Sequence, residues 1–503
     1  DSLNFVSPLA YYDYENNLIN ATGVKFIEVA DARIYPDKGL VTVNPDYKLK
    51  SFINSRIRAN RFTKHHTIHT STVHIESRND YHGMGNYDYV DENDDVQLIH
   101  FNEVKVDTGL HTIASGEIFE TANFTLNPVF KYQGKVRLHA NDSLLTFDGA
   151  TLIEEPCDNL KPSWLDFETR IDPRDIYIPV DANPIDINKM KIFNSIFVYY
   201  DSVHVYPAFL SSRKSYSDSP LISPEGYLYY DKAQKLYKVG SKEKINDFTL
   251  SDDYMSFHRE ECRINSEGNI DLGQELGLVK LKNYGTAKHD IEGNKTELDL
   301  IMAIDFPMNM DMINLMGTEI DSFPNLKAVN LNRNINKKAL NAWIGEKQAK
   351  RFTDELNLLG EVRELPEELK ATIILNDLKL VWNDITNSYQ SVGPIGIASI
   401  NGIQINKKVE GFFELRIKRS GDMMDLYLQM DRRNYYYFGY TRGVMQTLSH
   451  NREYVGVIMN MKAKDRKVKT PRGSTPYNYL ISTDRKKNNF YRRWQDALND
   501  EDE

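Results

Sequence analysis

The feature that most constrains this chain is a loose seven-residue pattern that recurs through its first 155 residues. Each copy runs apolar, variable, polar, small, variable, apolar, variable, and has the length of one β-strand. The copies are VADARIY (29–35), FINSRIR (52–58), IHTSTVH (68–74), IHFNEVK (99–105), IASGEIF (113–119), KYQGKVR (131–137) and TFDGATL (146–152), the last two departing from the pattern at their first position. Recurrence at irregular intervals predicts an irregular β-solenoid or a curled β-stack, in which each strand buries alternate side chains against its neighbours.

A small residue stands at the centre of every copy. These residues are Ala32, Ser55, Ser71, Asn102, Gly116, Gly134 and Gly149. A strand that turns a corner brings backbones close together, where a bulky side chain would clash and where glycine adopts dihedral angles that other residues avoid. We therefore expect the strands to bend at these positions.

Histidines gather in the same region, because eight of the chain's twelve lie between His65 and His139. His69 and His100 hold the same position in two copies of the pattern, so stacked strands would align them on the outward face. Together with His65 they are candidate ligands of a zinc or copper ion, provided that a carboxylate or water completes the site. A ladder of polar surface side chains is the favoured alternative, and no cofactor is predicted.

Punctuation by proline and glycine predicts three domains. Residues 1–180 form the β-solenoid-like repeat domain, residues 181–305 a β-rich continuation or second β domain, and residues 306–503 an α+β domain. In the last of these, apolar spacing predicts a helix over 336–360, and alternation from residue 371 predicts an antiparallel meander with helices packed on it at 443–464 and 490–498. The predicted class is mainly β.

The C-terminal segment is strongly cationic in an otherwise acidic chain. Residues 462–493 contain eleven Lys or Arg against two Asp, whereas the whole chain has a formal net charge of −10. The candidate binding residues are Lys462, Lys464, Arg466, Lys467, Arg485, Lys486, Lys487, Arg492 and Arg493. They suit the phosphates of an anionic membrane or of lipopolysaccharide, with nucleic acid the less favoured partner. The alternative partner is protein, either another subunit, the remainder of a larger chain, or this chain's own acidic body.

Familiar catalytic motifs are missing from the sequence. It contains no phosphate loop, dinucleotide-binding glycine pattern, HExxH helix, GxSxG turn or paired CxxC. Polysaccharide-cleaving β-helix enzymes carry no short signature, so Asp166 with Glu168, and Asp88 with Asp91, remain candidate acid pairs. The question of enzyme activity stays open, and a non-catalytic role is favoured.

Cysteine content and hydropathy do not determine the cellular compartment of the protein. Cys157 and Cys262 allow at most one disulfide. No segment has the run of about 18 apolar residues that a membrane-spanning helix needs.

The runs YDYVDENDDVQLIHFNEVKVD and KYQGKVRLHANDSLLTFDGATLI resemble the rungs of large cell-envelope proteins of Bacteroidetes-type bacteria. They are also similar to the β-stacks of periplasmic lipopolysaccharide-bridge proteins. The resemblance covers about residues 20–155 and rests on the loose pattern. It implies a bacterial cell-envelope location and a non-catalytic scaffold, and it transfers no site residue.

Three functional hypotheses follow from these observations. The first is a cell-envelope or extracellular scaffold that belongs to a larger chain or assembly and docks through its C-terminal domain. The second is a polysaccharide-binding or polysaccharide-cleaving β-helix enzyme. The third is a β-duct that carries lipid.

Overall fold

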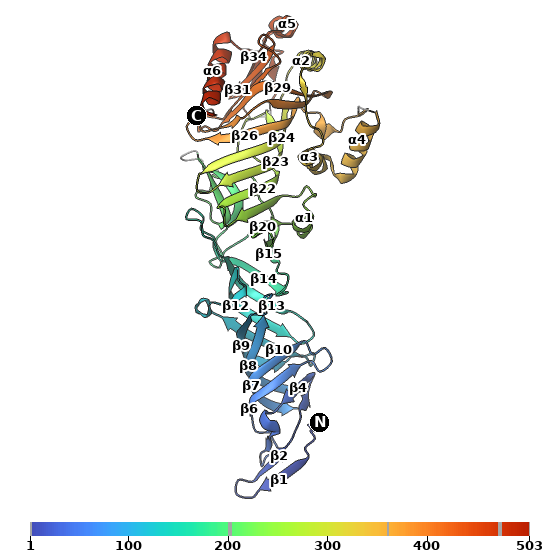
Figure 1. The fold of residues 1–503 in the computed structure, drawn as a ribbon, viewed down its shortest axis with the longest axis vertical. Coiled ribbons are helices and arrows are strands. Elements are labelled where there is room, and N and C mark those ends of the chain that lie inside the picture. The colour runs from blue at the N-terminus through green and yellow to red at the C-terminus, as the bar shows by residue number, and fades with distance from the viewer. Residues whose placement is uncertain (1–2, 200–203, 360–361, 471–474, 502–503) are drawn as a thin grey trace. The chain divides into compact units, whose positions relative to one another are not determined.

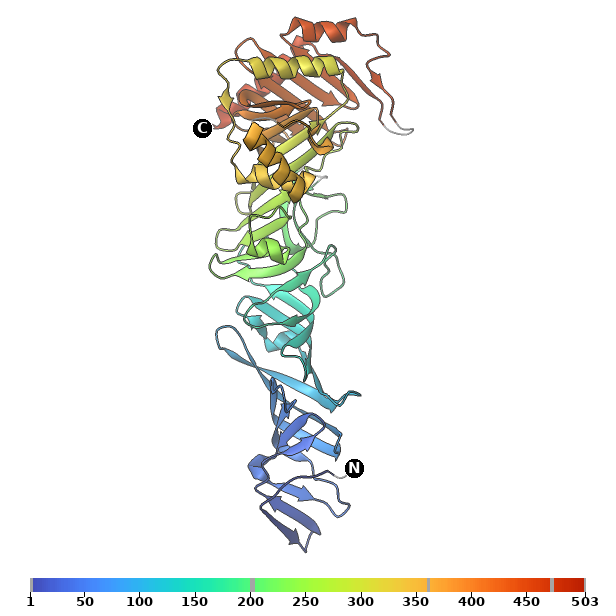
Figure 2. The same ribbon diagram turned by 90° about the vertical axis from the view of Figure 1, so that its right-hand side faces the viewer.

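The computed structural model describes residues 3–199, 204–359, 362–470 and 475–501, and it shows a mainly β protein (Figure 1 and Figure 2). The chain divides into two compact units. The first contains residues 1–155, 162–192 and 227–230, and the second contains residues 156–161, 193–226 and 231–503. Large antiparallel sheets dominate both units.

The main sheet of the first unit is a meander in which most strands lie beside the strand that precedes them in the sequence. In order across the sheet, its strands are β14 (Leu165–Ile171), β13 (Leu145–Ile153), β12 (Phe130–His139), β10 (Thr112–Ile118), β9 (Val96–Val106), β8 (Asp80–Val90), β7 (His66–Ser77), β6 (Phe52–Ala59), β4 (Ala32–Tyr35) and β3 (Ile27–Val29), with β11 (Thr125–Asn127) paired to β12. The unit also contains β1 (Leu9–Asp13), β2 (Leu18–Thr22) and β5 (Val41–Val43) in a small sheet, the 3-10 turns η1 (Asp37–Gly39) and η2 (Glu120–Ala122), β15 (Ile178–Val180) and most of β19 (Gly226–Asp231).

All seven copies of the repeated pattern lie on strands of this sheet, with VADARIY spanning the β3–β4 hairpin. The small residues lie where strands approach closely. Ser55 and Ser71 are opposite each other and share a hydrogen bond of 2.8 Å. Gly134 faces Gly149, and a Cβ on Gly134 would lie 2.5 Å from the Gly149 Cα atom. The close approach therefore requires small side chains at these pairs.

Strand β7 shows how one face of the sheet becomes buried. Ile68 and Val73 are fully buried, whereas the intervening His69 and Thr70 are not. Val73 lies five positions after Ile68, an odd spacing that strict alternation would place on opposite faces. Thr70 has a positive φ of 51°, and the register with β8 shifts between His69 and Thr72, so a bulge returns Val73 to the core side.

Hydrogen bonds between distant parts of the first unit hold the meander in a bent form. The Tyr81 hydroxyl on β8 lies 2.7 Å from the Thr112 hydroxyl at the start of β10. The backbone N–H and the hydroxyl of Thr112 both donate to the Asp31 carboxylate in the β3–β4 turn. Because β4 and β10 are separated by four strands of the sheet, the sheet bends to bring them together.

The second unit contains a longer sheet. Its strands are β20 (Leu236–Gly240), β21 (Tyr254–His258), β22 (Arg263–Asn269), β23 (Lys280–Asp290), β24 (Lys295–Asp305), β25 (Lys327–Ala328), β26 (Ile373–Asn383), β27 (Ser388–Ser391), β28 (Ile395–Ile400), β29 (Ile403–Arg416), β30 (Met423–Gln429), β31 (Tyr435–Thr441), β32 (Val444–Ser449), β33 (Lys467–Val468) and β34 (Tyr477–Ile481). β34 joins β32 in parallel. A smaller sheet contains β17 (His204–Ser211), β16 (Phe193–Tyr199) and β18 (Ser219–Pro220).

Helices cover parts of the second unit's sheet. They are α1 (Lys242–Asn246), α2 (Met310–Ser322), α3 (Asn334–Ile344), α4 (Glu346–Leu359), α5 (Arg452–Asn460) and α6 (Asp484–Glu501), together with the 3-10 turn η3 (Glu367–Leu369). The Asn309 side chain caps α2 by accepting from the N–H groups of Asp311 and Met312. Among the described residues, no helix is long and apolar enough to cross a bilayer.

Two predicted helices differ from the structure in detail. The helix predicted over 336–360 is broken into α3 and α4 at Gly345, which has a φ of 79°. The helix predicted over 443–464 begins instead as strand β32, because Val444–Ser449 pairs with β31, and only Arg452–Asn460 is helical. Tertiary pairing decides the conformation of this stretch.

The second unit also combines residues from both sides of the domain boundary predicted at residue 305. Strand β24, which ends at that residue, pairs with β23 before it and with β26 after it. The sheet therefore continues through the predicted boundary, and the helices α2, α3 and α4 are an insertion between β24 and β26.

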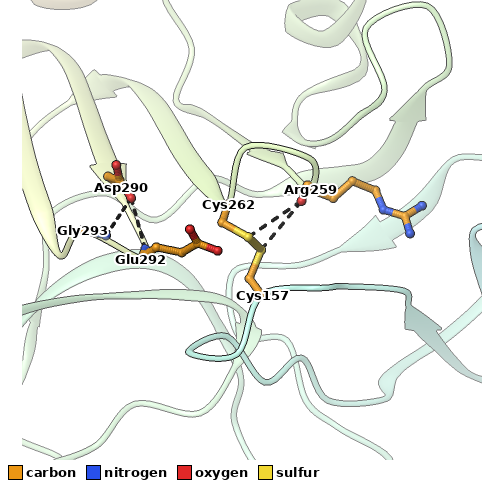
Figure 3. Close-up of a disulfide and its surroundings, with 6 residues drawn as sticks. All are labelled: Cys157, Arg259, Cys262, Asp290, Glu292 and Gly293. Carbon is orange, nitrogen blue, oxygen red and sulfur yellow. Dashed lines mark hydrogen bonds between the residues drawn. A yellow bond between two sulfur atoms is a disulfide. The ribbon is translucent and has the colours of Figure 1, made fainter.

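Cys157 and Cys262 form a disulfide within the second unit (Figure 3). Their Cα atoms lie 5.7 Å apart and their sequence separation is 105 residues. Both sulfur atoms lie within 3.9 Å of the Arg259 carbonyl oxygen. The bridge fastens the segment at Cys157 to the turn between β21 and β22.

Candidate functional site

The three histidines predicted as metal ligands lie on or next to two strands of the main sheet, β7 and β9. His65 is exposed just before β7, His69 is half-buried on β7, and His100 is exposed on β9. Asn86 of β8 is opposite both His69 and His100, so two interstrand spacings, about 10 Å, separate them. His65, His69 and His100 are not among the described residues whose ligand atoms gather within reach of one ion.

His69 and His100 instead make hydrogen bonds along the surface of the sheet. His69 Nε2 lies 3.0 Å from an Asp88 carboxylate oxygen, and His100 Nδ1 lies 2.9 Å from the Asn86 side-chain oxygen. This arrangement corresponds to the ladder of polar side chains that the sequence offered as an alternative.

The neighbouring His66 has a structural role. Its side chain is buried, with Nε2 lying 2.7 Å from the Asp142 carbonyl oxygen and Nδ1 lying 3.2 Å from the Tyr87 hydroxyl. Burial lowers the pKa of His66, so the ring is held neutral. The interaction fastens the start of β7 to the turn after β12.

A different group of ligand-type side chains comes together at the end of β9 and β12. Asp107, His111 and His139 present ligand atoms that all lie within 4.8 Å of one another, and each residue is half-buried. The sequence places His111 and His139 in the histidine-rich region but does not indicate that their side chains meet. They are brought together by the register of β10 and β12, in which Ile113 is opposite His139.

A hollow of about 550 Å³ lies beside this group on the same sheet. Its lining includes His139 together with a row of polar side chains from five neighbouring strands, namely Glu103, Ser115, Arg137, Thr146 and Arg170. These five residues are cross-strand neighbours in register. The first unit therefore has a concave patch on one face of its sheet, which a row of polar side chains crosses.

The candidate acid pairs are engaged in other interactions. Asp166 accepts a hydrogen bond of 2.6 Å from Lys189, and Glu168 pairs with Arg137. Asp88 is bonded to His69, as described above. Asp91 is buried and shapes a turn, because its Oδ1 accepts from the N–H groups of Asn93 and Asp95.

The cationic residues near the C-terminus divide into two groups. Lys462, Lys464, Lys467, Arg485, Lys486 and Arg492 are exposed, whereas Arg466, Lys487 and Arg493 are half-buried. Among the exposed six, no ion pair to a described acidic group is formed. Lys487 lies over the Tyr435 ring at 4.6 Å, so it packs against the sheet.

Arg493 fastens helix α6 to a buried acidic pair. Its guanidinium lies 3.2 Å from Glu414 and 3.5 Å from Asp425, both of which are buried. Arg416 pairs with the same two carboxylates, and the Tyr437 hydroxyl donates to Asp425 at 2.7 Å. Burial raises the pKa of Asp425, and the two guanidinium groups oppose that rise. This network is internal, which agrees with the view that some cations serve this chain's own acidic body.

A second buried charge cluster supports α1 and α3. Glu267 of β22 accepts from Lys244 of α1 at 2.5 Å and from Lys338 of α3 at 2.6 Å. Both ammonium groups also lie within 4.4 Å of the centre of the Phe248 ring. Burial lowers the pKa of Lys244 while Glu267 opposes that change. We assign this cluster to packing because all three charged side chains are buried.

Comparison with known proteins finds no match to any protein family, to any curated protein or to any solved structure.

Proposed function

We propose that this protein is a non-catalytic scaffold and binding component of a bacterial cell envelope. The observation that carries the proposal is the main sheet of the first unit, an antiparallel meander whose strands mostly hydrogen-bond to their sequence neighbours. Such a sheet can be extended by adding strands at its edges, which suits a structural spacer.

The disulfide supports an envelope location. Protein disulfides persist in oxidising compartments such as the bacterial periplasm and cell surface, and are uncommon in the reducing cytosol. Cys157 and Cys262 are the only cysteines of the chain, and they are bonded to each other. The sequence resemblance to envelope proteins points to the same compartment.

Docking is assigned to the exposed cations of the second unit. Arg485, Lys486 and Arg492 are exposed on α6, which packs on the sheet through Phe490 and Trp494. Lys462, Lys464 and Lys467 lie in the segment between α5 and β34. These cations, on long flexible side chains, suit the phosphates of an anionic lipid surface. Each basic residue close to such a surface contributes about 1 kcal/mol of binding free energy.

Subcellular fractionation tests the location. The native protein, detected with an antibody in a source bacterium, is expected in the envelope fraction, with Cys157 and Cys262 oxidised. Recovery in the cytosol with free thiols would reject the envelope proposal.

Vesicle sedimentation tests the docking surface. The full chain is expected to bind phosphatidylglycerol vesicles at low salt, to release them as salt rises, and to ignore phosphatidylcholine vesicles. Reversing Arg485, Lys486 and Arg492 to Glu should weaken binding at least tenfold. A matched control reverses the exposed lysines Lys25, Lys131 and Lys135 of the first unit and should bind normally.

Two outcomes would overturn this docking proposal. Equal loss in the control variant would show that net charge alone governs binding. Absence of vesicle binding at low salt, together with capture of an acidic envelope protein, would assign the cationic surface to a protein partner.

A further inference from the structure

Asp107, His111 and His139 form a compact group with the chemistry of a metal site. Asp107 and His111 belong to the turn between β9 and β10, and His139 is the last residue of β12. Two imidazoles and one carboxylate are the donor types that zinc and related divalent ions take in proteins. The group is independent of the cationic docking surface, since it lies in the first unit.

The carboxylate of Asp107 lies between the two imidazoles, at distances close to those between ligands of one ion. Asp107 Oδ1 lies 3.7 Å from His111 Nδ1, and Asp107 Oδ2 lies 3.5 Å from His139 Nε2. Ligand atoms about 2.0 to 2.2 Å from a tetrahedral zinc ion are separated by about 3.3 to 3.6 Å. With one donor atom taken from each residue, the three atoms lie within 4.8 Å of one another. Side-chain shifts of up to about 1 Å would bring them to the spacing of ligands around a single ion.

The turn between β9 and β10 holds the carboxylate in place. Asp107 Oδ1 accepts hydrogen bonds from the backbone N–H groups of Gly109 and His111, at 2.8 and 2.9 Å. The turn is closed by Leu110, whose φ is 63°. Asp107 is thus fixed before any ion arrives.

Glycine at position 109 makes room for the first imidazole. A Cβ on Gly109 would lie 2.9 Å from His111 Nδ1 and 3.2 Å from Asp107 Oδ1. Any side chain there would crowd both of the donor atoms. The tight turn and the position of the His111 ring therefore depend on this glycine.

The second imidazole reaches the group through strand register. His139 is opposite Ile113 in the β10–β12 pairing, and its ring centre lies 5.5 Å from that of His111. Its Nδ1 points toward the Asn141 backbone N–H at 3.4 Å, which leaves Nε2 facing Asp107. An ion on Nε2 would place the proton on Nδ1 and replace this long hydrogen bond.

We propose that Asp107, His111 and His139 bind one divalent transition-metal ion, of which Zn²⁺ is the best match to the donors. Three protein ligands leave at least one coordination position for water or for an oxygen of a partner. Of the three proposed ligands, His139 also lines the hollow described above. The same three residues without an ion would form only a carboxylate bridged to two imidazoles.

Calorimetry of Zn²⁺ binding to the full chain, after treatment with a chelator, tests the proposal. We expect one site with micromolar or tighter affinity at pH 7.5. His111→Ala and His139→Ala should each weaken it at least tenfold, and Asp107→Asn should do so as well. The Co²⁺-loaded protein should show the visible absorption of a site with fewer than six ligands.

The other histidines of the region provide the matched control. His69→Ala and His100→Ala remove the same chemical group from the same sheet, and both variants should bind Zn²⁺ like the parent chain. Circular dichroism and thermal unfolding of the metal-free variants check that each one folds. If His111→Ala or His139→Ala does not fold, His111→Gln or His139→Gln takes its place.

Two results would overturn the proposal. One is the absence of binding below about 100 µM Zn²⁺, which would leave an ion-free polar cluster. The other is equal loss of binding in the His69 and His100 variants, which would assign the ion to the surface ladder.

Discussion

The first unit and the second unit bury their strands in different ways. On β7 of the first unit, apolar side chains face the interior while polar ones such as His69 and Thr72 stay at least partly open to solvent. On β31 of the second unit, Tyr436, Tyr437 and Phe438 are all buried. Helices cause this difference, because Tyr436 contacts Glu319 of α2 and Tyr454 of α5, whereas Tyr437 packs against Phe490 of α6.

This difference shows when an alternating strand exposes its polar side chains to solvent. A strand with one covered face has room for functional polar groups on the other face, as the hollow beside His139 shows. A strand covered on both faces carries its charges in satisfied internal pairs, as Glu414 and Asp425 do with Arg416 and Arg493. Chemistry is thus expected on the open face of the first unit, and stability in the covered strands of the second.

The largest expected effect is the loss of stability on removing the disulfide, and it should be confined to the second unit. Replacing both Cys157 and Cys262 by Ser opens a loop of 105 residues, which should lower the free energy of unfolding of the second unit by about 4 to 5 kcal/mol. Hydrogen exchange followed by mass spectrometry should show lost protection in the second unit and unchanged protection in β7 to β10. A loss below 1 kcal/mol would contradict this account.

Alanine substitutions at neighbouring positions test the two modes of burial directly. Tyr436→Ala and Tyr437→Ala should each cost about 3 to 4 kcal/mol, because both side chains are buried on opposite faces of β31. On β7, Ile68→Ala should cost about 3 kcal/mol, whereas His69→Ala should change stability by less than about 0.5 kcal/mol. Urea denaturation measures all four. Similar costs for Ile68 and His69 would break the comparison.

A buried histidine makes the second unit sensitive to acid. Burial lowers the pKa of His289 on β23 to about 4, and its Nδ1 lies 2.8 Å from the Thr296 hydroxyl. In the unfolded chain a histidine titrates near 6.5, so below that pH the unfolded state binds a proton that the folded state does not. Stability should therefore fall by about 3 kcal/mol between pH 6.5 and pH 4 through this residue.

The variant His289→Asn isolates that contribution. The difference in unfolding free energy between parent and variant should be constant above pH 7 and should change in favour of the variant as the pH falls toward 4. A difference that stays constant over the whole range would show that His289 is not the source.

The smallest expected effect concerns helix α6. Arg493→Ala removes one of two guanidinium partners of Glu414 and Asp425 and should cost about 2 kcal/mol, because Arg416 still compensates part of the buried charge. Arg492→Ala, at the exposed neighbouring position, should cost less than about 0.5 kcal/mol. Equal costs would mean that α6 is held by its aromatic residues alone.

Much of the local structure could be predicted from the sequence. The seven-residue pattern marks strands of one sheet, and the turn-forming residues Ser420-Gly421-Asp422 lie between β29 and β30. The helical periodicity near Trp343 marks α3 and α4. These features are local, because strand alternation, turn residues and helix faces are written in neighbouring residues.

The covering of β31 could not be predicted in the same way. Alternation assigns Tyr436, Phe438 and Tyr440 to the core and leaves Tyr437 outside, yet Tyr437 is also buried. Its burial depends on Phe490 and Trp494 of α6, which lie more than 50 residues further along the chain. Position in a strand indicates a face, but it does not indicate what covers that face.

The sequence by itself determined a mainly β chain, its repeated small residues, its histidine-rich region and its cationic segment, because each of these depends on residue type and on spacing within a few positions. Only the tertiary structure decided which histidines meet a carboxylate. His111 and His139 approach Asp107 through the register of β10 and β12. A slip of one residue in that register would turn His139 to the opposite face of the sheet, and no local pattern specifies it.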